Sequence, residues 1–169
     1  PVVATAPYAA SHSHRIARVF LVAPAGMDMN ESRLEYFCRK VPVIGDWAHG
    51  FFVGKKMRVS LKSKAAPIAE IQSFQLSRRG YLPAVLSSRR NALSESLEEA
   101  HRKLGRDDVP VFAFWARDDT TIPLSAMGTL AQWNRSVRQE DIADAGHALP
   151  YSHADALAEK IKVVLRELY

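Results

Sequence analysis

The most informative stretch of the chain is Val111-Phe112-Ala113-Phe114-Trp115-Ala116-Arg117-Asp118-Asp119-Thr120-Thr121-Ile122-Pro123. Its first half is an unbroken apolar run, which predicts a strand over 109–115 that is buried on both faces, as in a parallel sheet. The run then ends abruptly in two carboxylates, Asp118 and Asp119. Because ligands bind beside the carboxyl ends of parallel strands, the stretch predicts a functional site as well as a sheet.

Two further segments predict strands of the same sheet. Residues 16–22 are mostly apolar, and residues 137–143 are more polar, as expected of an edge strand. Residues 124–133 have helical spacing, and apolar residues recur at i, i+3, i+4 and i+7 through 154–168, which predicts an amphipathic helix. This alternation of strand and helix predicts parallel pairing through right-handed crossovers. The predicted fold class is therefore α/β.

The middle of the chain, residues 30–104, breaks this alternation. It contains no convincing strand, whereas 31–40 has helical spacing and 81–104 predicts one long helix or two. We therefore expect a core formed by residues 1–29 and 105–169, interrupted by a helical insertion. An insertion between strands of a parallel sheet usually lies over their carboxyl ends, where it can act as a lid.

Length and composition exclude several classes of protein. With 169 residues, 47% hydrophobic and 24% charged, the chain can bury a core and is neither disordered nor fibrous. Its single cysteine, Cys38, excludes an internal disulfide scaffold. No apolar run approaches the roughly 18 residues that cross a bilayer, so we expect no transmembrane segment. Residues 1–10 lack the basic start of a signal peptide, which makes the cytoplasm the default location.

The chain is basic, with a net charge of +5, and its Lys and Arg residues gather in short runs. These runs are Lys55-Lys56 with Arg58, Lys62 and Lys64, then Arg78-Arg79, Arg89-Arg90 and Arg102-Lys103. Such runs can bind phosphate backbones or anionic membrane surfaces, although they are more often solvated faces of helices. Because no nucleic-acid-binding motif accompanies them, we expect no nucleic-acid partner.

A second polar group, His147, follows the third predicted strand in the segment Ala145-Gly146-His147. The carboxylate of Asp119 and this imidazole come after neighbouring strands, so they are expected to meet at one edge of the sheet. A carboxylate so placed can orient an imidazole and stabilise its cation. Gly146 permits a tight turn that would carry the imidazole over the sheet. The pattern therefore predicts Asp119 as an acid partner and His147 as a general base.

Other readings of these residues stay open. A single Asp in a loop more often caps a turn, and a single Gly-His pair is usually an ordinary surface loop, but their joint occurrence favours the acid–base pair. Asp118 is the nearest rival acid, and Asp119 is preferred for its spacing from Trp115. Asp141 and Asp144, on or beside the third strand, are weaker candidates.

The chain resembles the C-terminal half of an α/β-hydrolase. Residues 20–26 are similar to the sixth strand of that family and the loop after it. Residues 115–123 match its W-G-x-x-D-x-x-[IV]-P segment, with Asp119 at the acid and Ala116 where the family usually has glycine. Residues 145–147 match its histidine loop, and residues 79–88 resemble its lid region.

The resemblance implies a partial α/β-hydrolase fold, with three parallel strands, flanking helices and a helical lid. It implies that Asp119 and His147 belong to the Ser-His-Asp triad of a serine esterase, a lipase or a carbon–carbon bond hydrolase, with no cofactor and no metal. Residues 1–169 contain no G-x-S-x-G elbow, and the family register puts the nucleophile just before Pro1. We therefore expect no triad activity from the chain alone; the alternative is a non-catalytic binding or interaction module.

The expected substrate is a small apolar acyl compound or ester. Trp47, Phe51, Phe52 and Tyr81 are predicted to line an apolar pocket under the lid, with packing inside the lid as the alternative. The strand over 16–22 would be an exposed edge. We therefore expect either a homodimer or a complementing N-terminal hydrolase segment as partner.

Overall fold

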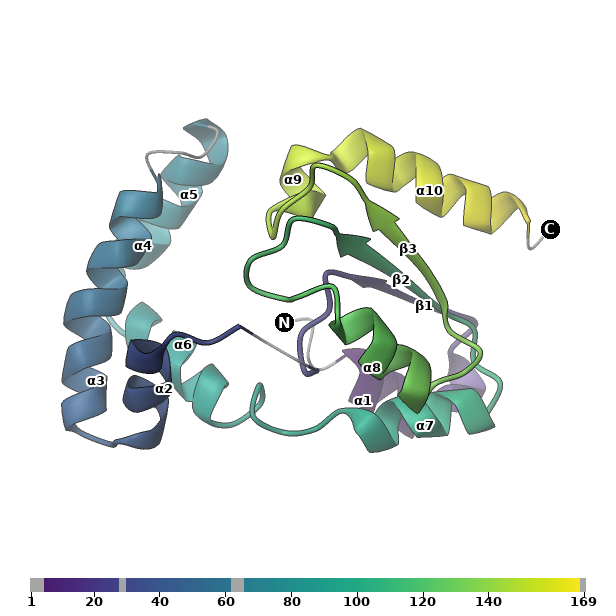
Figure 1. Ribbon diagram of the computed structural model, residues 1–169, viewed down its shortest axis with the longest axis horizontal. Coiled ribbons are helices and arrows are strands. Elements are labelled where there is room, and N and C mark those ends of the chain that lie inside the picture. Colours follow the sequence, from purple (N-terminus) through teal and green to yellow (C-terminus); the bar gives the residue numbers. More distant parts are fainter. Residues whose placement is uncertain (1–4, 28–29, 62–65, 168–169) are drawn as a thin grey trace. The chain divides into compact units, whose positions relative to one another are not determined.

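The computed structural model describes residues 5–27, 30–61 and 66–167. By their contacts the residues divide into two compact units. The first unit combines Pro1–Asn30 with Glu95–Tyr169, and the second is Glu31–Ser94. Figure 1 shows a sheet with helices in the first unit and a purely helical second unit.

The sheet of the first unit has three parallel strands. These are β1 (Val19–Val22), β2 (Val111–Ala116) and β3 (Arg138–Ile142), in the spatial order β1-β2-β3. Phe114 of β2 lies opposite Val22 in β1 and opposite Glu140 in β3. The predicted α/β fold class and parallel pairing are confirmed.

Burial along the strands follows from this order. All six residues of the central strand β2 are buried, as its unbroken apolar sequence predicted. The first residue of β3, Arg138, is exposed, and only its last, Ile142, is fully buried. The polar sequence of β3 is that of an edge strand.

Helices cover both faces of the sheet (Figure 1). They are α1 (Thr5–Ser11), α7 (Glu98–Arg106), α8 (Ala126–Trp133), α9 (Leu149–Ser152) and α10 (Ala154–Arg166), with a short 3₁₀ turn over Ser13–Arg15. Trp115 belongs to a core cluster shared with α1, α7 and α8, whereas Phe114 belongs to a second cluster shared with α9 and α10. This division follows because successive side chains of a strand point to opposite faces.

The helical unit ends earlier than the sequence indicated. The segment 81–104 forms parts of two helices, α6 (Tyr81–Arg90) and α7. Helix α7 packs against α1 and α8, and its Leu104 is fully buried in the same cluster as Trp115. The boundary therefore lies after Ser94 and not after Leu104, because α7 covers the sheet.

The second unit is built from helices alone. They are α2 (Arg33–Lys40), α3 (Ile44–Ala48), the π-helical turn η3 (His49–Val53), α4 (Gly54–Ser60), α5 (Ala66–Ser77) and α6. The segments α3, η3 and α4 follow one another as a single rod (Figure 1). Across the described ranges, no helix has the length and apolar character needed to cross a membrane.

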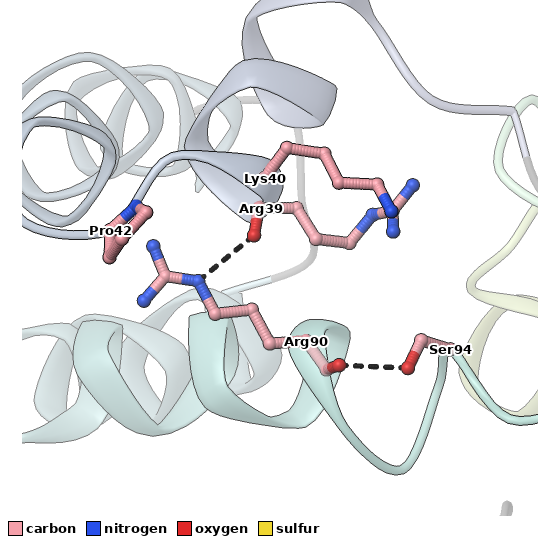
Figure 2. Close-up of a pocket in the computed structure, with 5 residues that line it drawn as sticks. All are labelled: Arg39, Lys40, Pro42, Arg90 and Ser94. Carbon is pink, nitrogen blue, oxygen red and sulfur yellow. Dashed lines mark hydrogen bonds between the residues drawn. The ribbon is translucent and has the colours of Figure 1, made fainter.

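Arg90 ties the C-terminal end of α2 to the rest of the helical unit. Its Nε donates to the carbonyl of Arg39 at 3.1 Å (Figure 2), and its Nη2 donates to the carbonyls of Cys38 and Val41 at 2.7 and 3.2 Å. Its Nη1 binds Asp46 Oδ1 at 2.8 Å. One guanidinium thus binds the carbonyls of Cys38 and Arg39 at the end of the helix and that of Val41 just beyond it, which also accepts from the Gly45 amide at 3.1 Å.

Candidate active site

The loop after β2 fixes the Asp119 side chain in one orientation. Its Oδ1 accepts hydrogen bonds from the backbone amides of Thr121 at 2.7 Å and Ile122 at 3.0 Å. Ile122 is itself buried and anchors the loop in the core cluster of Trp115. The side chain of Asp119 is 2% exposed. Asp119 therefore caps a turn, as the simpler interpretation proposed, but with one of its two oxygens.

The loop that carries His147 is joined to the Asp119 loop through backbone hydrogen bonds. The Asp118 amide donates to the Ala145 carbonyl at 2.9 Å, and the Arg117 amide donates to the Ile142 carbonyl at 3.0 Å. Ala145 has no exposed surface, so the loop is pinned to the core directly before the histidine. These contacts place the ends of β2 and β3 side by side.

The second oxygen of Asp119 meets His147. Nδ1 of His147 lies 2.8 Å from Oδ2 of Asp119. An ionised carboxylate can only accept, so Nδ1 is the donor, and in the neutral imidazole Nε2 is then an acceptor. The histidine side chain is 52% exposed, and no hydrogen bond to Nε2 comes from any residue that the structure describes. This arrangement can take a proton at Nε2 while a buried carboxylate stabilises the resulting cation.

The other candidate carboxylates, those of Asp118, Asp141 and Asp144, do not bind His147 in the structure. Asp141 pairs with Arg117, whose hydrogen bond holds the pKa of the Asp141 carboxyl below its usual range. Asp118 is exposed, and Asp144 is a turn residue with a φ of +55°. Of the carboxylates in the described ranges, Asp119 is the one bonded to His147.

A tight turn begins at Gly146, whose carbonyl accepts from the Leu149 amide at 2.9 Å, but this turn does not require glycine at position 146. Its φ lies outside the left-handed region, and a Cβ built on it would sit 3.7 Å from the carbonyl oxygen of Asp118, an ordinary contact. The left-handed residue of this loop is Asp144, two positions earlier. Asp residues tolerate that conformation better than most, so the turn needs no glycine.

Three of the four predicted substrate-binding residues lie together. The rings of Trp47, Phe51 and Phe52 pack on one another, with centroid separations of 5.8 Å for Trp47–Phe51 and 5.0 Å for Phe51–Phe52. They are 66%, 58% and 46% exposed, in that order. Tyr81 lines a small pocket of about 110 Å³ with Met57 and Leu76 instead.

The structure also shows the surroundings of Cys38 and of the first strand. Cys38 is fully buried, and burial raises the pKa of its thiol, which disfavours a reactive thiolate. Strand β1 pairs with β2 on one side, and no described strand lies on its other side. Within the described residues, no three His, Cys, Asp or Glu side chains form a group that could hold a metal ion.

The backbone amides that hold Asp119 were not predicted. The signal was present in Asp119-Thr120-Thr121-Ile122, because an Asp side chain commonly accepts from the amide two residues on. The sequence presents turn capping and an acid role as alternatives for Asp119, whereas one carboxylate makes both sets of contacts.

A family model described as alpha/beta hydrolase fold matches residues 72–154. Solved structures match nearly the whole chain. The chain has the α/β-hydrolase fold. A meta-cleavage product hydrolase from Pseudomonas fluorescens IP01 matches with a TM-score of 0.69 and 16% identity, over 99% of this chain and 62% of that one.

Two further hydrolase-fold structures are similar to the same degree. An esterase from Thermogutta terrifontis matches with a TM-score of 0.68 and 16% identity, over 98% of this chain and 61% of that one. The 2-hydroxy-6-oxo-6-phenylhexa-2,4-dienoate hydrolase from Rhodococcus sp. strain RHA1 matches with a TM-score of 0.70 and 16% identity, over 98% and 60%. The chain thus spans about three fifths of these structures. No match was found among curated proteins.

Proposed function

We propose that this chain carries the acid and the base of a serine hydrolase that acts on carboxylic esters or related acyl compounds. One observation carries the proposal: the 2.8 Å hydrogen bond from Nδ1 of His147 to the buried carboxylate of Asp119. A general base needs an imidazole in a fixed orientation with one nitrogen free, and this bond provides both.

In the proposed reaction a serine hydroxyl from outside residues 1–169 attacks the substrate carbonyl. Its proton passes to Nε2 of His147 as the oxygen–carbon bond forms, and Asp119 stabilises the imidazolium. His147 then returns the proton to the departing alcohol, which leaves an acyl-enzyme. Water then attacks the acyl-enzyme while His147 accepts its proton at Nε2, and His147 returns that proton to the serine oxygen as the carboxylic acid leaves. The absence of a G-x-S-x-G elbow from residues 1–169 is the reason for assigning the serine elsewhere.

The choice of substrate class is supported by the named activities of the similar structures. They include an esterase and carbon–carbon bond hydrolases, and both kinds of reaction can use one acid–base pair. Contact of Trp47, Phe51, Phe52 and Tyr81 with the apolar part of the substrate stays a prediction. Replacing Phe51 by Ala should raise KM for longer acyl chains and leave acetyl esters unaffected.

The test is hydrolysis of p-nitrophenyl butyrate by two proteins. One is the chain of residues 1–169, and the other is the longer product of its gene if an in-frame G-x-S-x-G elbow lies upstream. We expect no triad turnover from the first. In the second, His147→Ala should lower kcat by about 10⁴-fold or more.

Two results would contradict the proposal. Activity of residues 1–169 that disappears in His147→Ala would show a nucleophile within the chain. A longer form whose activity survives His147→Ala would remove the histidine from the mechanism. If no elbow lies upstream, the non-catalytic binding module becomes the better description.

A further inference from the structure

The basic character of the chain resides entirely in the helical unit. Residues 31–94 contain twelve Lys and Arg against four Asp and Glu, a net charge of +8. The rest of the chain contains eleven against fourteen, a net charge of −3. A surface this asymmetric attracts anionic partners and repels a second copy of itself.

An exposed aromatic cluster lies in the same unit. Trp47, Phe51 and Phe52, here called the aromatic cluster, project from the rod of α3, η3 and α4. Val59, farther along the rod, is 58% exposed. Large apolar side chains gathered on one exposed face usually mark an interaction site.

Two glycines fix which face of the rod turns outward. A Cβ on Gly45 would lie 2.7 Å from the carbonyl oxygen of Cys38 in α2, and a Cβ on Gly54 would lie 2.7 Å from Leu82 Cδ1 in α6. At Gly45 a Cβ would meet backbone atoms of α2, so only glycine fits there, whereas at Gly54 the tip of the Leu82 side chain would have to move. The two contacts show that this face packs against α2 and α6. The buried Ala48 lies on the same face. The aromatic cluster is therefore not part of the core of its own unit.

Basic residues continue the outward face of the rod. Lys55 is four residues after Phe51 and Val59 is four residues after Lys55, so the three lie along one stripe of the helix. Lys55 and Arg58 are exposed, and neither forms an ion pair with any residue that the structure describes. Their charges are available to a partner.

We propose that the helical unit docks on anionic phospholipid membranes through the aromatic cluster and the basic residues beside it. Trp and Phe rings are favoured at the bilayer interface, and helices that lie there combine an apolar face with Lys and Arg. The charge of +8 selects anionic over neutral lipids. The proposal concerns binding alone and does not depend on the hydrolytic role of His147.

The test is binding of residues 1–169 to sedimentable vesicles of phosphatidylcholine alone or with 30% phosphatidylglycerol. We expect binding to the anionic vesicles only, weakened by raised salt. Trp47 is the reporter, since Trp115 is buried and Trp133 is half-buried. Its emission should shift to shorter wavelength on binding, and Trp47→Phe should remove that shift.

Matched variants separate specific docking from general charge attraction. Lys55→Glu with Arg58→Glu should lower the partition coefficient at least tenfold, since each basic residue near the surface contributes about fivefold. Arg135→Glu with Arg166→Glu changes the net charge equally on exposed residues of the other unit and should have little effect. Phe51→Ala with Phe52→Ala should also lower binding tenfold. Circular dichroism checks that each variant folds.

Several results would overturn the proposal. These are no binding to anionic vesicles, equal losses in the two charge-reversed variants, or unchanged binding when both phenylalanines are replaced. Binding to DNA without binding to vesicles would assign the basic surface to nucleic acid. A dimer that Phe51→Ala dissociates, with no vesicle binding, would assign the aromatic cluster to self-association.

Discussion

At the scale of single residues, Asp119 divides its two carboxylate oxygens between structure and chemistry. Oδ1 holds the loop through two backbone amides, and Oδ2 holds the imidazole of His147. A residue with both tasks is sensitive to any change in its shape. The two tasks can be separated by substitution, because asparagine keeps one acceptor oxygen and alanine keeps none.

Asp119→Ala should therefore cost stability as well as function. It leaves the amides of Thr121 and Ile122 without their acceptor, which should lower the free energy of unfolding by about 2 kcal/mol. Asp119→Asn should cost less than half of that, since its amide oxygen can accept from the same donors. Urea unfolding followed by circular dichroism measures both. Equal losses in the two variants would show that Oδ1 does not hold the loop.

Two glycines should differ in how much stability is lost when each is replaced by alanine. Gly146→Ala should change the free energy of unfolding by less than about 0.5 kcal/mol, since its φ is ordinary and its Cβ has room. Gly26→Ala should cost roughly 2 kcal/mol, because Gly26 has a φ of +97° and a Cβ would lie 2.4 Å from Leu97 Cδ1. Thermal unfolding compares them. A large loss of stability in Gly146→Ala would show that the turn beginning at Gly146 needs glycine after all.

At the scale of elements, α7 buries a histidine against α8 in the first unit. His101 is 1% exposed, stacks on Trp133 and has no partner for Nδ1 among the described residues. Burial lowers the pKa of His101 to about 4. His101 is therefore harder to protonate in the folded protein than in the unfolded chain.

This histidine predicts a loss of stability in mild acid. Because the folded pKa lies below the unfolded value, stability is fully present above about pH 6.5 and is lost as the pH falls towards 4. The loss should reach about 3 kcal/mol. His101→Phe keeps a ring beside Trp133 and should flatten this part of the curve. Superimposable pH–stability curves for the two proteins would contradict the assignment.

The end of α2 depends on one side chain from another helix. Arg90→Lys keeps the charge but cannot reproduce the fork that reaches the carbonyls of Cys38, Arg39 and Val41. We expect Arg90→Lys and Arg90→Ala to increase amide hydrogen exchange in α2 and α3 to a similar extent. Exchange in β2 should not change, since it belongs to the other unit. Full protection in Arg90→Lys would mean that charge alone suffices.

At the scale of the whole molecule, the sheet could be predicted and the partition of the helices could not. The apolar run 111–116 is short and rich in aromatic and β-branched residues, which favours a strand covered on both faces, as observed. The periodicity of α7 predicts that one of its faces is buried, but it does not indicate which element covers that face. Its place on the sheet follows from contacts with α1 and α8, which are far away in sequence.

The pairing of Asp119 with His147 could be predicted from the order of the strands, whereas the rest of the candidate site could not. Asp119 and His147 follow adjacent strands, so their meeting is a consequence of topology. The orientation of the aromatic residues was not predictable, because it depends on the close approach of Gly45 and Gly54 to other helices. When a helix carries apolar residues on several sides, its hydrophobic pattern does not indicate which side packs against neighbouring helices.

The measurement that tests the central claim most directly is ¹⁵N NMR of the His147 ring in residues 1–169, at a pH where the imidazole is neutral. The bond to Asp119 predicts a ring protonated at Nδ1, with Nε2 bare and ready to accept a proton. Asp119→Asn should shift the population towards the Nε2-protonated form. A wild-type ring protonated at Nε2, unchanged by Asp119→Asn, would show that the pair does not exist and would contradict the account.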